Sequence, residues 1–209
     1  MTMKRFVFDF GAVLFAWQPV QLLRQVMPEH AHDDASAAGL VGQVFQNYGG
    51  DWAEFDKGTV APQDLVPRIA SRTGLPESAL WALVDAIPDA LTPLAASVDL
   101  VQQLRRPGTP MFYLSNMPAP YADELERRHD FVRNFDAGVF SGRVQLVKPD
   151  PQIFALAAQR FGTAPGDLVF LDDHLPNVKA AQAAGWNALH FSDAANAAKA
   201  IRDAGWWPD

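Results

Sequence analysis

The sequence predicts an α/β protein with a parallel sheet at its core and a helical insertion near the N-terminus. Short apolar runs that favour β-strands recur along the chain, and a helical pattern follows each of them. Strands that alternate with helices are typical of βαβ units, in which helices cover both faces of a parallel sheet. The helical stretch after the first run is much longer than the others, which predicts an insertion at that point.

Four apolar runs are the expected strands, and each of them ends at polar residues. Parallel strands buried on both faces are apolar throughout, which these runs match. Open α/β sheets bind ligands beyond the carboxyl ends of their strands, so the polar residues mark the expected site. The runs and the polar residues that end them are Phe6–Phe8 with Asp9, 110–114 with Ser115-Asn116, 168–171 with Asp172-Asp173, and 188–191 with Ser192-Asp193.

Two groups of helices are expected. Helices behind the strands are expected at 119–129, 151–161, 176–184 and 194–204. Between residues 16 and 89 we expect helices near 19–27, 34–46, 62–73 and 77–87, with no strand between them. Proline residues near the first turn mark two of these helix starts. The chain therefore divides into a core, residues 1–15 and 90–209, and a helical cap, residues 16–89, which is expected to lie over the ligand edge of the sheet.

Composition excludes several classes of protein. The chain has no cysteine, which excludes disulfide scaffolds, thiol catalysis and thiolate metal sites. Its net charge of −7 argues against a nucleic-acid binder, because no basic surplus is available to neutralise phosphates. Lys4 and Arg5 precede only three apolar residues, too few for a signal peptide, and no run is long enough to span a membrane. We expect a cytoplasmic protein without membrane contact, either a monomer or a homodimer.

The polar residues at the strand ends form a set that suits phosphoryl transfer. Taken singly, each is an ordinary turn or helix-cap residue. Together, Asp9 and the pair Asp172-Asp173 supply the hard oxygen ligands that Mg²⁺ prefers. The Ser115 hydroxyl and the Lys148 ammonium supply donors for phosphate oxygens. Because phosphoryl transfer depends mainly on positioning and charge neutralisation, this set predicts a Mg²⁺-dependent phosphoryl-transfer site.

Four strings also carry a resemblance to a known family: FVFDFGAVL at 6–14, LSN at 114–116, VKPDPQIF at 147–154 and VFLDDHLPNVKAA at 169–181. They resemble the motifs of the haloacid dehalogenase-like hydrolase superfamily, in the branch with a helical cap inserted after the first motif. The segment 55–60 is similar to that branch's cap segment. The resemblance implies a Rossmann-like core, Mg²⁺ as the cofactor and an enzyme that hydrolyses phosphoric monoesters. The expected substrate is a small phosphorylated metabolite, with a sugar phosphate as the favoured kind.

The resemblance also implies roles at the phosphate. Asp9 would attack phosphorus and form an aspartyl-phosphate intermediate. Ser115 and the backbone of Asn116 would hold the phosphate, and Lys148 would neutralise both the nucleophile and the phosphate.

The same resemblance implies a metal site of four residues. Asp9 and the backbone carbonyl of Gly11 would contact the metal. Asp173 would bind Mg²⁺ directly with Asp172 assisting through a water, although the sequence leaves open which of the two is the direct ligand.

Gly11 departs from the family pattern. Most phosphatases of the family carry a second aspartate at this position, which protonates the leaving group and then activates water. A general acid of this kind contributes about 10²- to 10⁴-fold to the rate. Three interpretations stay open: a substrate with a good leaving group, another proton donor such as His174 or a cap residue, or lost activity. The sugar-phosphate phosphatases with an Asp-x-Gly first motif resemble this chain and favour the first.

Two other functions are open alternatives. A 2-haloacid dehalogenase would use an aspartate nucleophile and an arginine for the halide, but it does not need the paired acids Asp172-Asp173. A catalytically silent phosphate-binding protein would not need the whole set.

In the cap, Trp17, Trp52 and Phe55 are expected either to line a substrate pocket or to pack the cap onto the core. Four polar cap residues could contact sugar hydroxyls or lie on the surface: Gln18, Asp51, Asp56 and Lys57.

Overall fold

The computed structural model describes residues 3–208, and its centre is a sheet of five parallel strands in the order β3-β2-β1-β4-β5. The strands are β1 (Arg5–Phe8), β2 (Met111–Ser115), β3 (Ala137–Phe140), β4 (Leu168–Asp172) and β5 (Asn187–His190). The predicted fold class, an α/β protein with a parallel sheet and an inserted helical cap, is confirmed.

The central strands are buried on both faces, which explains their uninterrupted apolar sequences. In β1, Val7 belongs to the apolar cluster on one face of the sheet, whereas Phe6 and Phe8 belong to the cluster on the other. Val7 is in register with Phe112 of β2 and with Phe170 of β4, and all three side chains belong to the same cluster. Successive side chains of a strand alternate between faces, so each strand contributes to both halves of the core.

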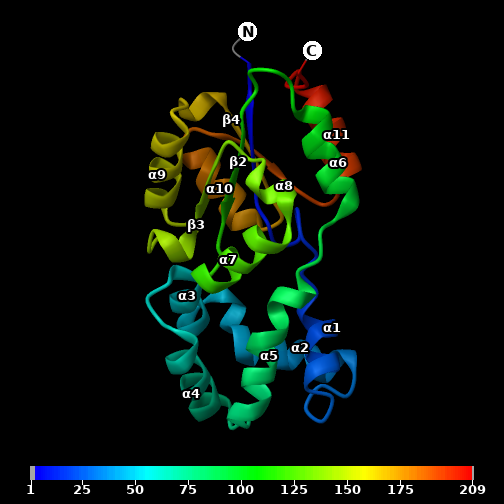
Figure 1. Ribbon diagram of the computed structural model, residues 1–209, viewed down its shortest axis with the longest axis vertical. Helices are drawn as coiled ribbons and strands as arrows, with labels where there is room; N and C mark the ends of the chain where they lie inside the picture. The colour runs from blue at the N-terminus through cyan, green and yellow to red at the C-terminus, as the bar shows by residue number, and fades with distance from the viewer. Residues whose placement is uncertain (1–2, 209) are drawn as a thin grey trace.

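Helices cover the two faces of the sheet (Figure 1). The apolar residues of α9 (Pro151–Phe161) and α10 (Leu175–Ala183) join the cluster that contains Val7. The opposite cluster takes in the helices α6 (Ala95–Leu104), α7 (Ala119–Arg128), α8 (Asp130–Arg133) and α11 (Ala194–Asp203). Two short 3₁₀ turns, Ser141–Arg143 (η2) and Pro165–Asp167 (η3), complete this part of the chain.

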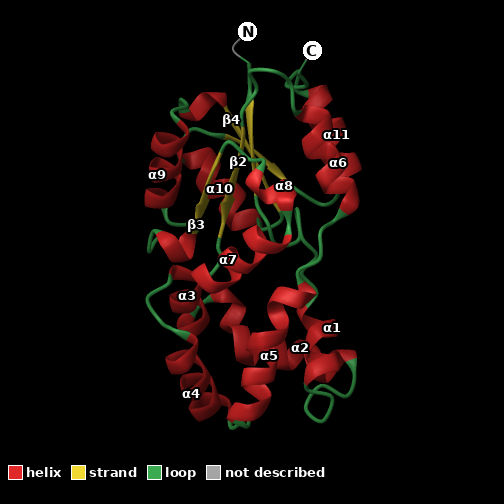
Figure 2. Cartoon of the chain, viewed as in Figure 1, coloured by secondary structure: helices red, strands yellow, loops and turns green. Residues whose placement is uncertain are grey.

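The segment between β1 and α6 is helical, and it forms the lower half of the molecule in Figure 2. Its helices are α1 (Pro19–Val26), α2 (Asp34–Phe45), η1 (Gln46–Tyr48), α3 (Gly50–Lys57), α4 (Pro62–Thr73) and α5 (Glu77–Ala90). Four of them match the sequence prediction, and α3 was not predicted. It has eight residues, begins at Gly50 directly after Gly49 and lacks a regular apolar stripe, so its stability comes from burial of Trp52 and Phe55.

Apart from the 3₁₀ turns, three elements of the core were also missed by the sequence analysis: the edge strand β3, the helix α6 and the four-residue helix α8. β3 contains Gly138, and glycine is depleted in strands. The structure explains the glycine: a Cβ at this position would overlap the Tyr113 ring, with 1.9 Å to its nearest atom. The sequence signal for the strand is weak because a neighbouring aromatic ring occupies the space above it.

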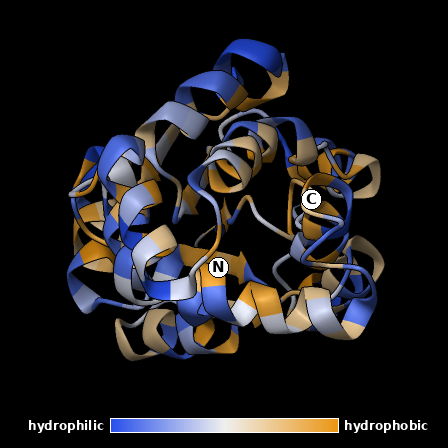
Figure 3. Cartoon of the chain, turned by 90° about the horizontal axis from the view of Figure 1, so that it is seen from below, coloured by the Kyte–Doolittle hydropathy of each residue, from blue (hydrophilic) through white to orange (hydrophobic). Residues whose placement is uncertain are grey.

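Seen from the helical end, hydrophilic and hydrophobic stretches alternate along the helices, as expected for helices buried on one side (Figure 3). No helix within residues 3–208 is both long and apolar enough to cross a membrane.

The helical segment is docked on the core where α3 ends. The Ser141 hydroxyl donates a hydrogen bond of 2.5 Å to the backbone carbonyl of Asp56, and it also accepts one from the Met117 amide. Beside it, Gly58 ends α3 with a left-handed φ of 78°, and a Cβ there would lie 2.3 Å from the Gly142 carbonyl oxygen. The two backbones approach so closely that only glycine fits at position 58.

Replacing Gly58 with alanine is expected to destabilise the protein by about 2–4 kcal/mol, because the left-handed conformation and the overlap with Gly142 both oppose a side chain. The matched control is Gly74→Ala. Gly74 ends α4 with a φ of 74°, but no atom lies within 4 Å of its would-be Cβ. That variant is expected to lose about 1 kcal/mol. Urea unfolding of both variants measures the difference, and equal losses would contradict the docking role of Gly58.

Candidate active site

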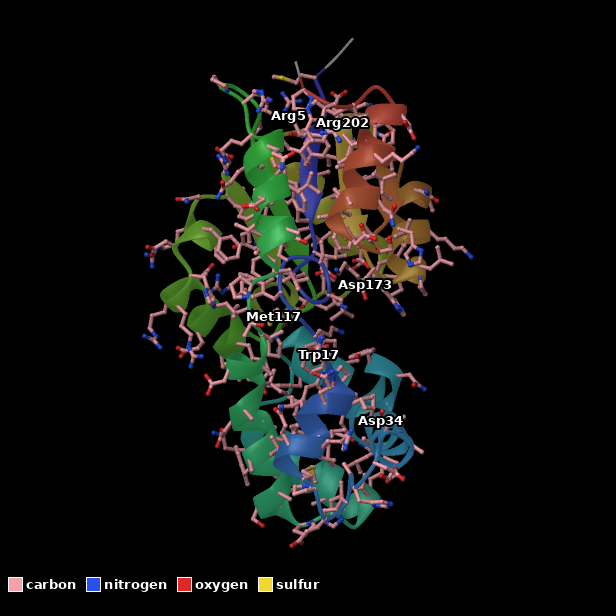
Figure 4. The ribbon with its side chains drawn as sticks, turned by 90° about the vertical axis from the view of Figure 1, so that its right-hand side faces the viewer. Arg5, Trp17, Asp34, Met117, Asp173 and Arg202 are labelled. Atoms are coloured by element: carbon pink, nitrogen blue, oxygen red, sulfur yellow. The ribbon has the colours of Figure 1, made fainter. Side chains whose placement is uncertain are left out.

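The predicted site residues meet at the carboxyl edge of the sheet, where it faces the helical segment. Asp9 follows β1, Ser115 ends β2 and Asp172 ends β4. In Figure 4, Asp173 and Met117 lie at the lower border of the core, and Trp17 lies just below them at the border of the helical segment. The structure therefore brings together residues that are far apart in the sequence.

A buried ion cluster forms the floor of the site. The Lys148 ammonium lies 2.9 Å from Asp9 Oδ2 and 2.6 Å from Asp172 Oδ2. All three side chains are buried. Burial alone would lower the pKa of Lys148, but the Asp172 and Asp9 carboxylates outweigh it and raise the pKa. Lys148 is therefore held charged, as neutralisation of a phosphate dianion requires.

Asp9 lies in a strongly perturbed environment. Burial raises its pKa to about 7, opposed by Lys148 and reinforced by the Asp172 and Asp173 carboxylates. One Asp9 oxygen accepts a hydrogen bond of 2.7 Å from the Phe10 amide. Shifted pKa values of this size are concentrated at functional sites.

Three carboxylates of the site can converge on one cation. Asp9, Asp172 and Asp173 each offer an oxygen, and these oxygens lie within 4.8 Å of one another. Next to them, Asn177 Oδ1 is the only fully enclosed side-chain polar atom of the described residues without a hydrogen-bond partner. A hydrated cation would satisfy this acceptor, since its waters are donors. The set of hard oxygen donors fits Mg²⁺.

The two adjacent acids differ in their surroundings. Asp172 is fully buried, and its oxygens already accept hydrogen bonds from Lys148, Asn177 and the His174 amide. Asp173 is exposed and lines the pocket, although partial burial and the Asp172 carboxylate raise its pKa. The oxygens of Asp173 are thus more accessible for a direct bond to a metal, whereas the oxygens of Asp172 are engaged in hydrogen bonds with Lys148 and Asn177.

Asn116 makes contacts that the sequence did not indicate. Its side-chain NH₂ group donates a hydrogen bond of 2.9 Å to the Lys148 backbone carbonyl, and its Oδ1 accepts a hydrogen bond of 2.8 Å from the Lys148 backbone amide. These paired bonds fix the backbone of Lys148 to the end of β2. Ser115 and Asn116 both line the pocket, where they were predicted to contact phosphate.

Above this floor is a pocket of about 290 Å³ between core and helical segment. The predicted pocket residues Trp17 and Trp52 line it, and so does Gly11. Phe55 does not: it is fully buried behind the wall, with its ring edge-on to those of Trp52 and Tyr121. It packs the helical segment onto the core, the second of the two roles expected for it.

Several pocket residues were missed by the sequence analysis because they lie outside the strand ends. Asn47 and Tyr48 belong to η1, where Gln46, Asn47 and Tyr48 all have positive φ. Such strained backbone needs support from surrounding structure. Further lining residues come from the helices and from the loop after β2, and ordinary apolar patterning hides them. They are Ile87, Leu91, Met117, Pro118 and Tyr121.

The parallel sheet with a helical insertion and the carboxylate–lysine cluster at its carboxyl edge are the features of an α/β enzyme of the hydrolase class. The model of the haloacid dehalogenase-like hydrolases matches residues 3–185, and the chain belongs to this family. It is 30% identical to a sesquiterpene phosphatase of Aspergillus oryzae, over 92% of this chain and 91% of the relative.

Solved structures share the fold. One is a haloacid dehalogenase family enzyme of Bacteroides thetaiotaomicron in complex with magnesium and inorganic phosphate. It has a TM-score of 0.71 and 21% identity, and the match covers 91% of this chain and 94% of that one. Another is an L-2-haloacid dehalogenase, with a TM-score of 0.67 and 19% identity over 90% of this chain and 86% of that one. Both likenesses show that the chain shares its fold with these proteins.

Proposed function

We propose that this chain is a Mg²⁺-dependent phosphatase that hydrolyses a small phosphate monoester through an aspartyl-phosphate at Asp9. The observation that carries the proposal is the ion cluster of Asp9, Lys148 and Asp172 beside Asp173, at the floor of the pocket. It provides a nucleophilic carboxylate, a fixed cation and a cation-binding acid in one place. The phosphatase of Aspergillus oryzae, similar over nearly the full length, supports the same reaction.

Each residue of the floor has a part in this reaction. Asp9 attacks phosphorus, and water later releases the phosphate from it. Lys148 neutralises charge on Asp9 and on the phosphate, while Ser115 donates a hydrogen bond to a phosphate oxygen. The Asn116 side chain positions Lys148 through two hydrogen bonds with the Lys148 backbone. Mg²⁺, held by Asp9, Asp173 and the Gly11 carbonyl, would supply the charge that reduces repulsion between the carboxylate and the phosphate.

The walls of the pocket favour an apolar organic group on the phosphate. Trp17 Nε1 already donates to the Tyr48 hydroxyl at 2.7 Å, and the Tyr121 hydroxyl donates to the Val84 carbonyl at 2.9 Å. The aromatic rings therefore offer carbon surface, and Ile87 and Leu91 extend it. A sugar phosphate, which the sequence suggested, would place hydroxyls against this carbon surface, with Asn47, Asp56 and His174 as the polar side chains of the lining outside the floor. The name of the Aspergillus oryzae relative, a sesquiterpene phosphatase, agrees with an apolar group.

A dehalogenase is less well supported by the same pocket. That reaction needs an arginine for the leaving halide, and no arginine is among the described residues that line the pocket. Of the three converging carboxylates, only Asp9 would take part in it, as the nucleophile, whereas Asp172 and Asp173 would have no part.

A substrate panel tests the proposed function. Octyl phosphate, glucose 6-phosphate, p-nitrophenyl phosphate and 2-chloropropionate are assayed with Mg²⁺ and with EDTA. We expect phosphate release from octyl phosphate with a kcat/KM at least about tenfold above that for glucose 6-phosphate. EDTA is expected to lower it by about 10²-fold or more. Undiminished turnover in EDTA, chloride release alone, or phosphate binding without turnover would each contradict the proposal.

A further inference from the structure

Asp56, in the last turn of α3, is a buried acid that lines the same pocket as Asp9, Lys148 and Gly11. Its exposed fraction is only 8%. Within residues 3–208, no ion pair or side-chain hydrogen bond involves its carboxyl group, and Lys148 is bonded to Asp9 and Asp172. A buried ionised carboxylate without a partner is costly, so this position favours the protonated acid.

The backbone of Asp56 is fixed to the core rather than free to move with a loose cap. Its carbonyl accepts the buried hydrogen bond from Ser141, and two residues further on Gly58 contacts Gly142. The Ser141 hydroxyl also accepts a hydrogen bond from the backbone amide of Met117, and Met117 lines the pocket. The docking contact between the helical segment and the core therefore determines where the Asp56 side chain lies.

The neighbourhood of Gly11 offers space but no acid. A Cβ added to Gly11 would meet only the Trp17 Cβ, at 4.0 Å. Asp9, Asp56 and Asp173 are the only carboxylic acids among the described pocket-lining residues. Asp9 is the proposed nucleophile and Asp173 a proposed metal ligand, which leaves Asp56. His174 also lines the pocket, but it lies on the exposed side of the site.

We propose that Asp56 is the catalytic acid and base of this phosphatase, supplied by the helical segment in place of the missing acid at Gly11. Resting on the proposed function, this inference concerns the same reaction. An apolar alcohol is a poor leaving group, so an enzyme for such esters needs a proton donor. Burial, opposed by Lys148 and reinforced by Asp9, raises the pKa of Asp56 well above that of a free aspartic acid, as a donor near neutral pH requires.

The proton balance of the reaction is complete with Asp56. An Asp9 oxygen forms a bond to phosphorus while the bond from phosphorus to the ester oxygen breaks. The ester oxygen takes the proton of Asp56, which gives the free alcohol and leaves Asp56 as a carboxylate. A water then attacks the aspartyl-phosphate and gives its proton to Asp56, and the bond between phosphorus and Asp9 breaks. Inorganic phosphate leaves, and both aspartates return to their starting states.

The test compares two leaving groups in Asp56→Asn. For octyl phosphate, whose alkoxide needs the proton, kcat/KM is expected to fall by about 10²- to 10⁴-fold. For p-nitrophenyl phosphate, whose phenolate leaves unaided, kcat/KM is expected to change less than about tenfold. For p-nitrophenyl phosphate, the kcat and the KM of Asp56→Asn should fall together. The first step is unaffected, whereas the later attack of water on the aspartyl-phosphate still lacks a base. Asp64→Asn, an exposed acid of α4, is the control and should match the wild type for both substrates.

A rescue experiment keeps the inference testable if the asparagine disturbs the site. The double variant Gly11→Asp with Asp56→Asn places an acid in the open space beside Asp9 and should regain at least about tenfold in kcat/KM for octyl phosphate. Asp56→Ser is a second variant with the same expected split between substrates. Equal losses for both substrates, or no loss for octyl phosphate, would overturn the role of Asp56. If the wild type hydrolyses neither ester, the proposed function itself fails.

Discussion

Asp9→Asn is expected to lower kcat/KM for every phosphate ester by about 10⁴-fold or more, because an amide cannot take Asp9's place as the attacking carboxylate. The loss should not depend on the leaving group, which distinguishes this variant from Asp56→Asn. Lys148 keeps its bond to Asp172, so the fold should be retained. Phosphate release measures the effect. Mass spectrometry of the wild type, quenched during turnover, should show one added phosphoryl group that Asp9→Asn lacks.

The control for this variant is Asp99→Asn, which removes an exposed carboxylate of α6 far in sequence from the site residues. It should leave both the rates and the phosphoryl adduct unchanged. Metal-dependent turnover that persists in Asp9→Asn would show that another group attacks phosphorus, and the proposed mechanism would be wrong.

Lys148→Met should produce the largest loss of stability. Lys148 is the ion-pair partner of Asp9 and Asp172, both of them buried. Removing one partner of a buried ion pair leaves uncompensated charge in a medium of low polarity and costs about 3–5 kcal/mol. Activity should also be lost, because Asp9 and the phosphate would lose the fixed side-chain cation between them. Urea unfolding in EDTA measures the change in the free energy of unfolding without help from a metal.

Lys199→Met is the matched control, since Lys199 pairs with Asp203 at 2.5 Å on the surface. An exposed substitution of this kind should change stability by no more than about 0.5 kcal/mol. The double variant Lys148→Met with Asp172→Asn removes one of the stranded charges and should recover part of the lost stability without recovering activity. Equal losses for Lys148→Met and Lys199→Met would mean that the buried cluster contributes nothing to the fold.

Much of the core could be predicted from local sequence. The strands β1 and β4 are continuous apolar runs that stop at charged residues. These residues are Asp9 after β1 and the pair Asp172-Asp173 at the end of β4. Continuous burial on both faces imposes that pattern, so the strands and the acids at their ends are visible in the sequence. The edge strand β3 was missed because the ring of Tyr113 requires a glycine in it.

The site shows the same division between local and distant causes. Lys148 was found from a motif and not from its surroundings, because one lysine in a loop has no distinctive local pattern. The clamp by Asn116 could not be predicted, since it joins two segments that are distant in the sequence. Phe55 and Asp56 are adjacent, yet one packs behind the pocket wall and the other faces the pocket. A helix turns about 100° per residue, so the docking of α3 decides which neighbour reaches the site.

By itself, the sequence determined the class of fold, the family and the acids and lysine at the carboxyl edge of the sheet, because each depends on patterns a few residues long. The absence of an acid at Gly11 was equally visible, but its consequence was not. Only the tertiary structure decided that a buried acid from the helical segment, Asp56, stands over the same pocket. The contacts that hold Asp56 in this place include the hydrogen bond from Ser141 to the Asp56 carbonyl and the close approach of the Gly58 and Gly142 backbones. Such contacts join distant parts of the chain, and no local pattern of residues records them.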